Sequence, residues 1–362
     1  MVLRIIVPDR PPFTPSGQVP PAAPSAPGLP TPLLPPAPSS TPSLASTQRI
    51  AAATPTPLSA PTSMASPAMP SVQPGKRITV QYPQVGSRLP SQRGEYEMLK
   101  VIGSGEFGAV YECNGPFDQV YALKVIRPAN RPYAEVYGEW AKETQRLMSL
   151  RHPNVVYIYD AFELQHLFYM ALEKCDHALK DMLGGPMQEG LIIELARQLL
   201  AAVQFLHDND IVHDDLHPGN VLIQHSVDRP VVKISDFGIS NELRGMPAIR
   251  PNVVHHSIMA PEVVSSGYTS KQSDIYQVGL LLYWMITGEP AIPIGVGYDE
   301  LVRIVGDGMP RKHADAIGTP LGSLVSKMLR RRDAYRYTSA REVWADLRQL
   351  PSWQNRQLFP IK

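Results

Sequence analysis

The spacing of apolar residues divides residues 96–287 into a strand-rich part followed by a helical part. From Leu191 onward apolar residues recur at intervals of three and four, which is typical of helices. Before that point, short apolar runs predict strands and one longer stretch predicts a helix. The predicted strands are 99–102, 109–113, 120–126, 155–162 and 167–172, and the early helix is 133–150. This order predicts an α+β fold with a small β-rich lobe and a larger helical lobe.

The chain before Gly94 has a composition that cannot form a packed core. More than half of the 38 prolines lie in it, with only two aromatic residues, Phe13 and Tyr82. The apolar area that such a segment can bury does not offset the conformational entropy lost on folding. We therefore expect residues 1–94 to be a disordered Pro/Ala/Ser/Thr-rich arm. The folded domain is then expected over residues 95–350. The arm is either a spacer or a regulatory segment that docks on a partner.

The net charge and the cysteine content limit the binding partners and the cellular location that the sequence predicts. The net charge is +1, which gives no reason to expect nucleic acid binding. The two cysteines argue against a disulfide scaffold, and the short apolar stretch at residues 3–7 is too short for a secretory leader. We therefore expect a cytoplasmic protein without a membrane partner.

A glycine-rich segment stands between two predicted strands and reads Gly103-Ser104-Gly105-Glu106-Phe107-Gly108-Ala109-Val110. Glycines let the backbone approach anionic oxygens, and backbone amides can donate to phosphate. A dinucleotide-binding fold shares this glycine spacing but would continue into a helix, whereas a strand follows here. The segment therefore predicts a phosphate-binding hairpin, with a hairpin that holds no ligand as the alternative.

Lys124 follows in Tyr121-Ala122-Leu123-Lys124, where apolar strand residues surround it. Burying an ammonium group without a partner is costly, so an acidic partner is expected. Helix 133–150 offers Glu143 and Glu139. We prefer Glu143 because the turn His152-Pro153-Asn154 fixes the end of the helix and therefore its register.

Polar residues suited to phosphoryl transfer follow the long helix. The segment 213–220 reads His-Asp-Asp-Leu-His-Pro-Gly-Asn, in which Asp215 is placed to orient an acceptor hydroxyl and take its proton. Asn220 and the aspartate of Asp236-Phe237-Gly238 are expected to hold Mg²⁺, which prefers oxygen ligands.

These motifs, in this order, resemble those of the protein kinase family over nearly all of residues 95–350. Ala260-Pro261-Glu262, the segment 273–279 and Arg336, placed to pair with Glu262, extend the resemblance. The resemblance implies a bilobal fold with an N-lobe of about 95–173 and a C-lobe of about 176–350. It also implies ATP and Mg²⁺ as cofactors and protein substrates as partners.

The family pattern assigns a role to each matching residue. Catalytic residues would be Asp215, Lys124 and Asn220. Leu172 would be the gatekeeper, and the backbone of Glu173 and Cys175 would bind adenine. The nucleotide would also contact Gly103, Ser104, Gly105, Glu106, Phe107, Gly108, Val110, Ala122, Lys124 and Glu143.

Three positions depart from the family pattern. Asp214 replaces the arginine that pairs with an activation-loop phosphate, and an aspartate would repel such a phosphate. We therefore expect no dependence on phosphorylation of Ser240 or Ser257. His217 and His255 replace a lysine and a threonine typical of Ser/Thr kinases. A Ser/Thr acceptor is still favoured, because the Ala/Arg-rich catalytic loop of tyrosine kinases is absent.

Three other interpretations remain. Aminoglycoside and choline kinases have a similar His-Pro-Gly-containing catalytic loop, but they are not expected to carry Asp-Phe-Gly followed by Ala-Pro-Glu. A nucleotide-binding pseudokinase scaffold would normally have lost Lys124, Asp215 or Asp236, and all three are present. The histidines at 213, 217, 255 and 256 suggest a metal site, but none of them needs a metal to be explained.

Overall fold

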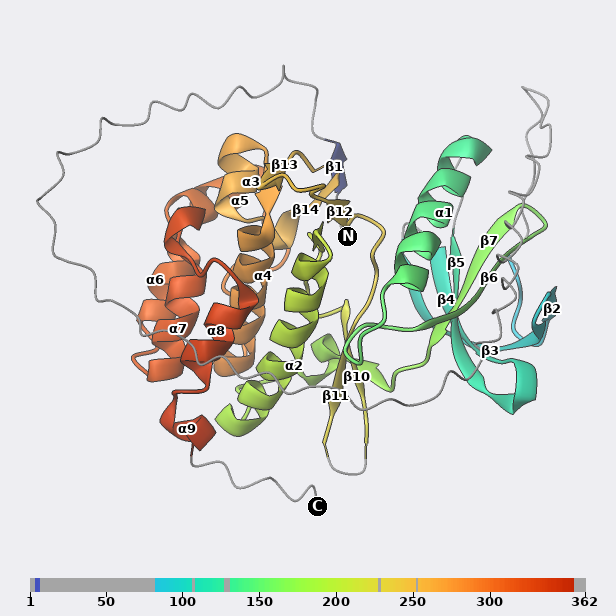
Figure 1. Ribbon diagram of the computed structural model, residues 1–362, viewed down its shortest axis with the longest axis horizontal. Coiled ribbons are helices and arrows are strands. Elements are labelled where there is room, and N and C mark those ends of the chain that lie inside the picture. The colour runs from blue at the N-terminus through green and yellow to red at the C-terminus, as the bar shows by residue number, and fades with distance from the viewer. Residues whose placement is uncertain are drawn as a thin grey trace, which may run out of the picture. The chain divides into compact units, whose positions relative to one another are not determined.

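The structure is a computed structural model. It describes residues 4–6, 82–105, 108–126, 131–226, 229–251 and 253–354, with the backbone alone for residues 4–6, 105, 253 and 254. The predicted α+β, bilobal fold is confirmed, with a β-rich N-lobe and a helical C-lobe (Figure 1). Most of the predicted disordered arm lies outside the described residues.

The N-lobe is built on one six-stranded antiparallel sheet with a single long helix beside it (Figure 1). In spatial order the strands are β2 (Arg88–Ser91), β3 (Gly94–Gly105), β4 (Gly108–Asn114), β5 (Val120–Ile126), β7 (Leu167–Glu173) and β6 (Ile158–Leu164). Helix α1 (Tyr133–Ser149) packs Trp140 on Phe168, with ring centroids 5.2 Å apart. Tyr96, Met98 and Leu123 belong to a separate apolar cluster in this lobe.

The expected domain boundary at residue 94 is wrong, because the sheet already includes β2. Leu89 is buried, and the Ser91 hydroxyl donates to Asp160 at 2.8 Å. β2 is an edge strand, where Pro90 can be accommodated without a backbone N–H. Residues 4–6 also depart from the expected disorder, because β1 (Arg4–Ile6) pairs antiparallel with β14 (Val253–His255).

We expect a fragment that begins at Arg93 to be less stable than one that begins at Thr79. The shorter fragment loses the burial of Leu89 and the hydrogen bond of Ser91 to a buried carboxylate. Together these changes should lower the free energy of unfolding by about 3 kcal/mol. Urea denaturation of the two fragments measures the difference, and equal midpoints and slopes would show that β2 contributes nothing to stability.

The C-lobe is mainly helical, and its short strands form two-stranded pairs and one three-stranded sheet (Figure 1). Its helices are α2 (Glu189–Asp208), α3 (Pro261–Ser266), α4 (Lys271–Thr287), α5 (Tyr298–Gly306), α6 (Met309–Asp315), α7 (Pro320–Met328), α8 (Ala340–Leu347) and α9 (Pro351–Gln354). Its remaining strands are β8 (His177–Ala178), β9 (Ile211–Val212), β10 (Val221–Gln224), β11 (Val231–Ile234), β12 (Asn241–Glu242), β13 (Ala248–Ile249) and β15 (Thr269–Ser270). Short 3₁₀ turns occur in both lobes: η1 (Pro116–Asp118) in the N-lobe, and η2 (Leu179–Met182), η3 (His256–Ile258) and η4 (Asp333–Tyr335) in the C-lobe.

Helices α2 and α4 provide much of the C-lobe core, with Leu199, Leu206, Ile275 and Leu282 among their fully buried residues. Among the described helices, α2 has the length and apolar composition of a membrane span, and most of that stretch is buried, as in the core helix of a globular lobe. Gly288 ends α4 with φ 81°, a conformation that favours glycine, and it packs against the backbone of Gly185.

The predicted strand 155–162 is only partly correct, because β6 begins at Ile158. Val155 instead forms an isolated bridge with Ile234, and the Val156 N–H donates to the Ile234 carbonyl at 2.9 Å. The Ile234 N–H donates to the Asn154 carbonyl at 2.9 Å. The first part of this apolar run therefore joins the two lobes rather than extending the N-lobe sheet.

Candidate active site

The glycine-rich segment forms the turn between β3 and β4, with Gly105 and Gly108 as the last paired residues. The expected contacts of Glu106 and Phe107 lie outside the described residues. Val110 lies opposite Lys124 in the β4–β5 pair, and Ala122 lies two residues before Lys124 on the same face. The glycine hairpin, Val110, Ala122 and Lys124 therefore share one side of the sheet.

Lys124 lies between two carboxylates that come from different lobes. Its Nζ is 2.8 Å from Glu143 Oε1 and 3.1 Å from Asp236 Oδ1. Burial opposes the positive charge, but Asp236 and Glu143 together raise the pKa of Lys124 above its ordinary value. The ammonium group therefore stays charged and couples the sheet, α1 and the Asp236-Phe237-Gly238 segment.

The register of α1 selects Glu143 as the partner of Lys124. Glu143 is buried, whereas Glu139 is exposed and pairs with Arg131 at 2.6 Å. Arg146, one turn after Glu143, donates from Nη1 to the Phe237 carbonyl at 3.3 Å and to the Ser240 carbonyl at 2.8 Å. These contacts fix the inner face of α1 against the start of the activation segment, residues 236–262.

Asp215 and Asn220 meet in the loop between β9 and β10. The Asn220 amide Nδ2 donates to the Asp215 carbonyl at 3.0 Å and to Asp215 Oδ2 at 3.1 Å. Burial lowers the pKa of His213, whose neutral ring donates from Nε2 to the Ser235 carbonyl and accepts the Asp215 N–H at Nδ1. The ring of His213 also packs on Phe237, so the loop is fixed against the Asp236 segment.

Two polar side chains of helix α4 form hydrogen bonds with the backbone of the same loop. Asp274 accepts the backbone N–H groups of His213 and Asp214, each at 2.9 Å. Gln277 accepts the Leu216 N–H at 3.0 Å and donates to the Asp214 carbonyl at 3.1 Å. Sequence reasoning missed the contact of Gln277, although its position three residues after Asp274 places both on one helix face.

Asp214 has a structural role that sequence reasoning did not find. It is buried, has φ 63°, and accepts hydrogen bonds from Asn241 Nδ2 at 2.7 Å and from the Thr269 hydroxyl. Burial, together with the negative charge of Asp274, raises its pKa to about 7. The two carboxyl oxygens of Asp214 therefore tie the catalytic loop to β12 and β15.

We expect Asp214→Asn to change how stability depends on pH. A carboxyl group with a pKa raised from 3.8 to about 7 favours the folded state at low pH, and this contribution is lost progressively as pH rises from 3.8 to about 7. Asparagine keeps the shape of the side chain and one acceptor oxygen, has no titrating group and tolerates positive φ. Between pH 5 and pH 8 the free energy of unfolding of the variant should therefore rise by about 2–3 kcal/mol relative to that of the unmodified chain.

Urea denaturation at the two pH values measures this gain, because other titrating groups are common to both proteins. Asp307→Asn, which removes an exposed carboxylate, is the matched control. If the two proteins differ in free energy of unfolding by the same amount at pH 5 and at pH 8, the raised pKa of Asp214 is contradicted.

The activation segment is held by buried contacts at both ends. Ser240 is buried, donates from its hydroxyl to the Phe237 carbonyl at 2.8 Å, and receives a hydrogen bond from Arg146. At the other end, Glu262 forms two hydrogen bonds with Arg336, at 2.8 and 2.7 Å, as expected. Ser240, one of the two serines of the activation segment, is therefore inaccessible to a modifying enzyme in this conformation.

The two unusual histidines lie beside Asp215. His217 and His255 stack with ring centroids 5.0 Å apart, and the Ser257 hydroxyl lies 3.0 Å from His255 Nδ1. His217 Nδ1 accepts the Gly219 N–H at 3.0 Å, so the neutral ring carries its proton on Nε2, which lies 3.9 Å from Asp215 Oδ1. One ligand atom from each of Asp215, His217 and His255 lies within 4.8 Å of the others. An imidazole that ligates a metal normally donates a hydrogen bond from its second ring nitrogen. Nδ1 of His217 instead accepts one, which argues against a metal at these three residues.

The hinge connects β7 to β8 and carries the expected adenine-binding residues. The Glu173 carboxylate is 2.7 Å from Lys233 Nζ, and the backbone N–H of Glu173 donates to the Tyr157 carbonyl at 2.8 Å. Leu172 lies opposite Ala122 in the β5–β7 pair, so it borders the same face as Lys124. Burial raises the pKa of Cys175 to about 12, so its thiol is neutral and acts as a small apolar side chain.

Comparison with known proteins identifies the family of this chain. The model of the protein kinase domain matches residues 96–347. The serine/threonine-protein kinase PrkC of Bacillus subtilis is 28% identical over 276 residues, covering 73% of this chain and 41% of that protein. The serine/threonine-protein kinase PknB of Mycobacterium leprae is 28% identical, with coverage of 73% and 44%. A carbon catabolite-derepressing protein kinase of Candida albicans is 32% identical over 205 residues, covering 55% of this chain and 33% of that protein. The chain thus spans less than half the length of these relatives, and it belongs to the protein kinase family.

Proposed function

We propose that this chain transfers the γ-phosphate of ATP to serine or threonine hydroxyl groups of protein substrates. The observation that carries the proposal is the position of Lys124, 2.8 Å from Glu143 and 3.1 Å from Asp236. This arrangement connects the sheet that would bind the phosphates to the aspartate that would hold the metal, and both must be in place for phosphoryl transfer. The names of the relatives favour serine or threonine as the acceptor.

Asp215 would act as the base that orients the acceptor hydroxyl and takes its proton. Its Oδ2 is fixed by Asn220, and Oδ1 faces the Nε2–H of His217 at 3.9 Å. Lys124 would bind phosphate oxygens while the two carboxylates hold its ammonium group in position. The glycine hairpin would cover the phosphates with its backbone amides.

The residues present fit a Mg²⁺ ion. Asn220 uses its Nδ2 to bind Asp215, which turns its amide oxygen away from that carboxylate, and Asp236 supplies a carboxylate. Oxygen donors of this kind, with phosphate oxygens, are what Mg²⁺ prefers. When bound, the ion would neutralise charge on the phosphates. Asn220 and Asp236 would hold it, and Lys124 would keep Asp236 oriented.

Acceptor specificity tests this proposal. Three peptides that differ only in having serine, threonine or tyrosine at one position would be incubated with the chain, ATP and Mg²⁺. We expect phosphate on the serine and threonine peptides and at least tenfold slower transfer to tyrosine. Preferential labelling of the tyrosine peptide would overturn the assignment of the acceptor.

We expect phosphatase treatment of the purified protein to leave its transfer activity unchanged. Asp214 binds Asn241 and Thr269, so the link between catalytic loop and activation segment needs no phosphate, and Ser240 is buried. Transfer rates before and after treatment measure this, with Ser257→Ala as a second comparison. Activity that falls after phosphatase and returns on rephosphorylation of either serine would contradict the prediction. A fall seen only in Ser257→Ala would instead reflect its place beside His255.

A further inference from the structure

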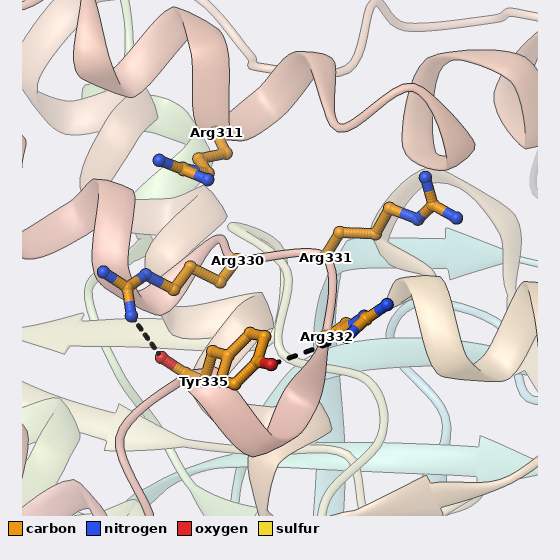
Figure 2. A pocket seen from close by; sticks show the side chains of 5 residues that line it. All are labelled: Arg311, Arg330, Arg331, Arg332 and Tyr335. Atoms are coloured by element: carbon orange, nitrogen blue, oxygen red, sulfur yellow. Dashed lines mark hydrogen bonds between the residues drawn. The ribbon is translucent and has the colours of Figure 1, made fainter.

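Four arginines and a tyrosine line a cavity of about 300 Å³ in the C-lobe, outside the site described above. Arg311 comes from α6, and the triplet Arg330-Arg331-Arg332 follows α7. Tyr335 ends the short turn after the triplet. In Figure 2 the guanidinium groups of Arg311 and Arg330 lie on one side of Tyr335, and those of Arg331 and Arg332 lie on the other.

The cavity carries an excess of positive charge. Arg311 pairs with Asp315 at 3.3 Å, but no carboxylate of the described residues forms an ion pair with the three arginines of the triplet. Arg330 Nη1 instead donates to the Tyr335 carbonyl at 3.1 Å, and Arg332 Nη1 lies 3.5 Å from the Tyr335 hydroxyl. Like charges gathered at one place repel each other, so a bound anion would stabilise this arrangement.

The backbone that carries the triplet is fixed by a buried ion pair. Arg336, whose side chain is fully buried, donates to the carbonyls of Arg330 at 2.7 Å and Arg331 at 3.4 Å. The same guanidinium binds Glu262, at the end of the activation segment. The positions from which the arginines extend are therefore set before any ligand arrives, which reduces the entropy lost on binding.

The chemistry of the lining favours a phosphate monoester. A guanidinium group can donate two parallel hydrogen bonds to the oxygens of one phosphate, and it keeps its charge at all physiological pH values. The volume is at the small end of ligand pockets, which suits a phosphoryl group and the residue that carries it. Tyr335 is 55% exposed and offers an aromatic surface to a neighbouring chain.

We propose that this cavity binds a phosphorylated segment of a protein substrate, so that the kinase retains substrates that already carry a phosphate. The inference rests on the proposed function for the source of the phosphate, since that function makes phosphoproteins its products. The binding itself depends only on the five lining residues.

Fluorescence anisotropy of a labelled phosphothreonine peptide, measured with the full chain and without ATP, tests this inference. Matched peptides carry threonine or glutamate at the same position. We expect the phosphopeptide to bind at least tenfold more tightly than either, and its affinity to fall as salt is raised. Arg331→Gln combined with Arg332→Gln should weaken binding of the phosphopeptide about tenfold or more. Both residues are exposed, so the fold should be retained, and thermal denaturation checks this.

Arg303→Gln and Arg341→Gln are the matched controls, because these exposed arginines lie outside the cavity. Equal affinity for the phosphorylated and unphosphorylated peptides would overturn the proposal, as would unchanged binding by the double variant. Tighter binding of single-stranded RNA or of vesicles containing an anionic lipid would also overturn it in favour of a different anion. Because no transfer is measured, peptide binding without kinase activity would refute the proposed function alone, and activity without peptide binding would refute this inference alone.

Discussion

Replacing Asp215 with asparagine should lower the turnover number by about two to four orders of magnitude while leaving ATP binding nearly unchanged. The substitution keeps the size of the side chain and its oxygen can still accept from Asn220, which is 3.1 Å from Asp215 Oδ2. It removes the carboxylate that would take the proton of the acceptor hydroxyl. Nucleotide binding depends on the sheet and on Lys124, which the substitution does not touch.

Steady-state kinetics with a peptide acceptor, together with calorimetric titration of ATP and Mg²⁺, measures both quantities. Asp307→Asn controls for the loss of one negative charge. Transfer within threefold of normal by a folded Asp215→Asn protein would refute the assignment of the base.

Lys124→Met should also reduce transfer by about a hundredfold or more, because it removes the cation that would hold the phosphates. It leaves Glu143 buried and close to Asp236 without their shared ammonium group. Breaking such a buried pair costs about 3–5 kcal/mol of stability, less if Glu143 takes up a proton. The chain should therefore remain folded, but with a lower midpoint of urea denaturation.

The double variant Lys124→Met with Glu143→Gln separates the two effects. Without a buried carboxylate at position 143 it should recover much of the stability lost in Lys124→Met, and transfer should stay low. Full activity in the double variant would show that the pair has a structural role alone.

The elements that could be predicted from the sequence are those determined by local pattern. The strand 120–126 and the helix around Glu143 follow from apolar periodicity and from the turn at His152-Pro153-Asn154. The choice of Glu143 over Glu139 agrees with the observed pairing because a turn with a defined position fixes which face of a helix points inward.

Features that depend on distant residues could not be predicted. The role of Asp214 depends on Asn241 and Thr269, which donate to its carboxyl oxygens and lie 27 and 55 residues further along the chain. The burial of Ser240 requires Arg146 from α1, 94 residues earlier. An edge strand such as β2 buries a single apolar side chain and contains a proline, so its pattern does not differ from that of a Pro-rich loop.

The most direct test of protein kinase activity follows the label of [γ-³²P]ATP in a reaction with Mg²⁺ and a generic protein acceptor, beside an identical reaction with [α-³²P]ATP. Label from the γ position alone should become covalently attached to the protein acceptor, on serine or threonine after acid hydrolysis, and Asp215→Asn should abolish nearly all of it. Label that stays in ATP and inorganic phosphate, or that moves only to a small molecule such as an aminoglycoside or choline, would contradict the assignment of protein kinase activity.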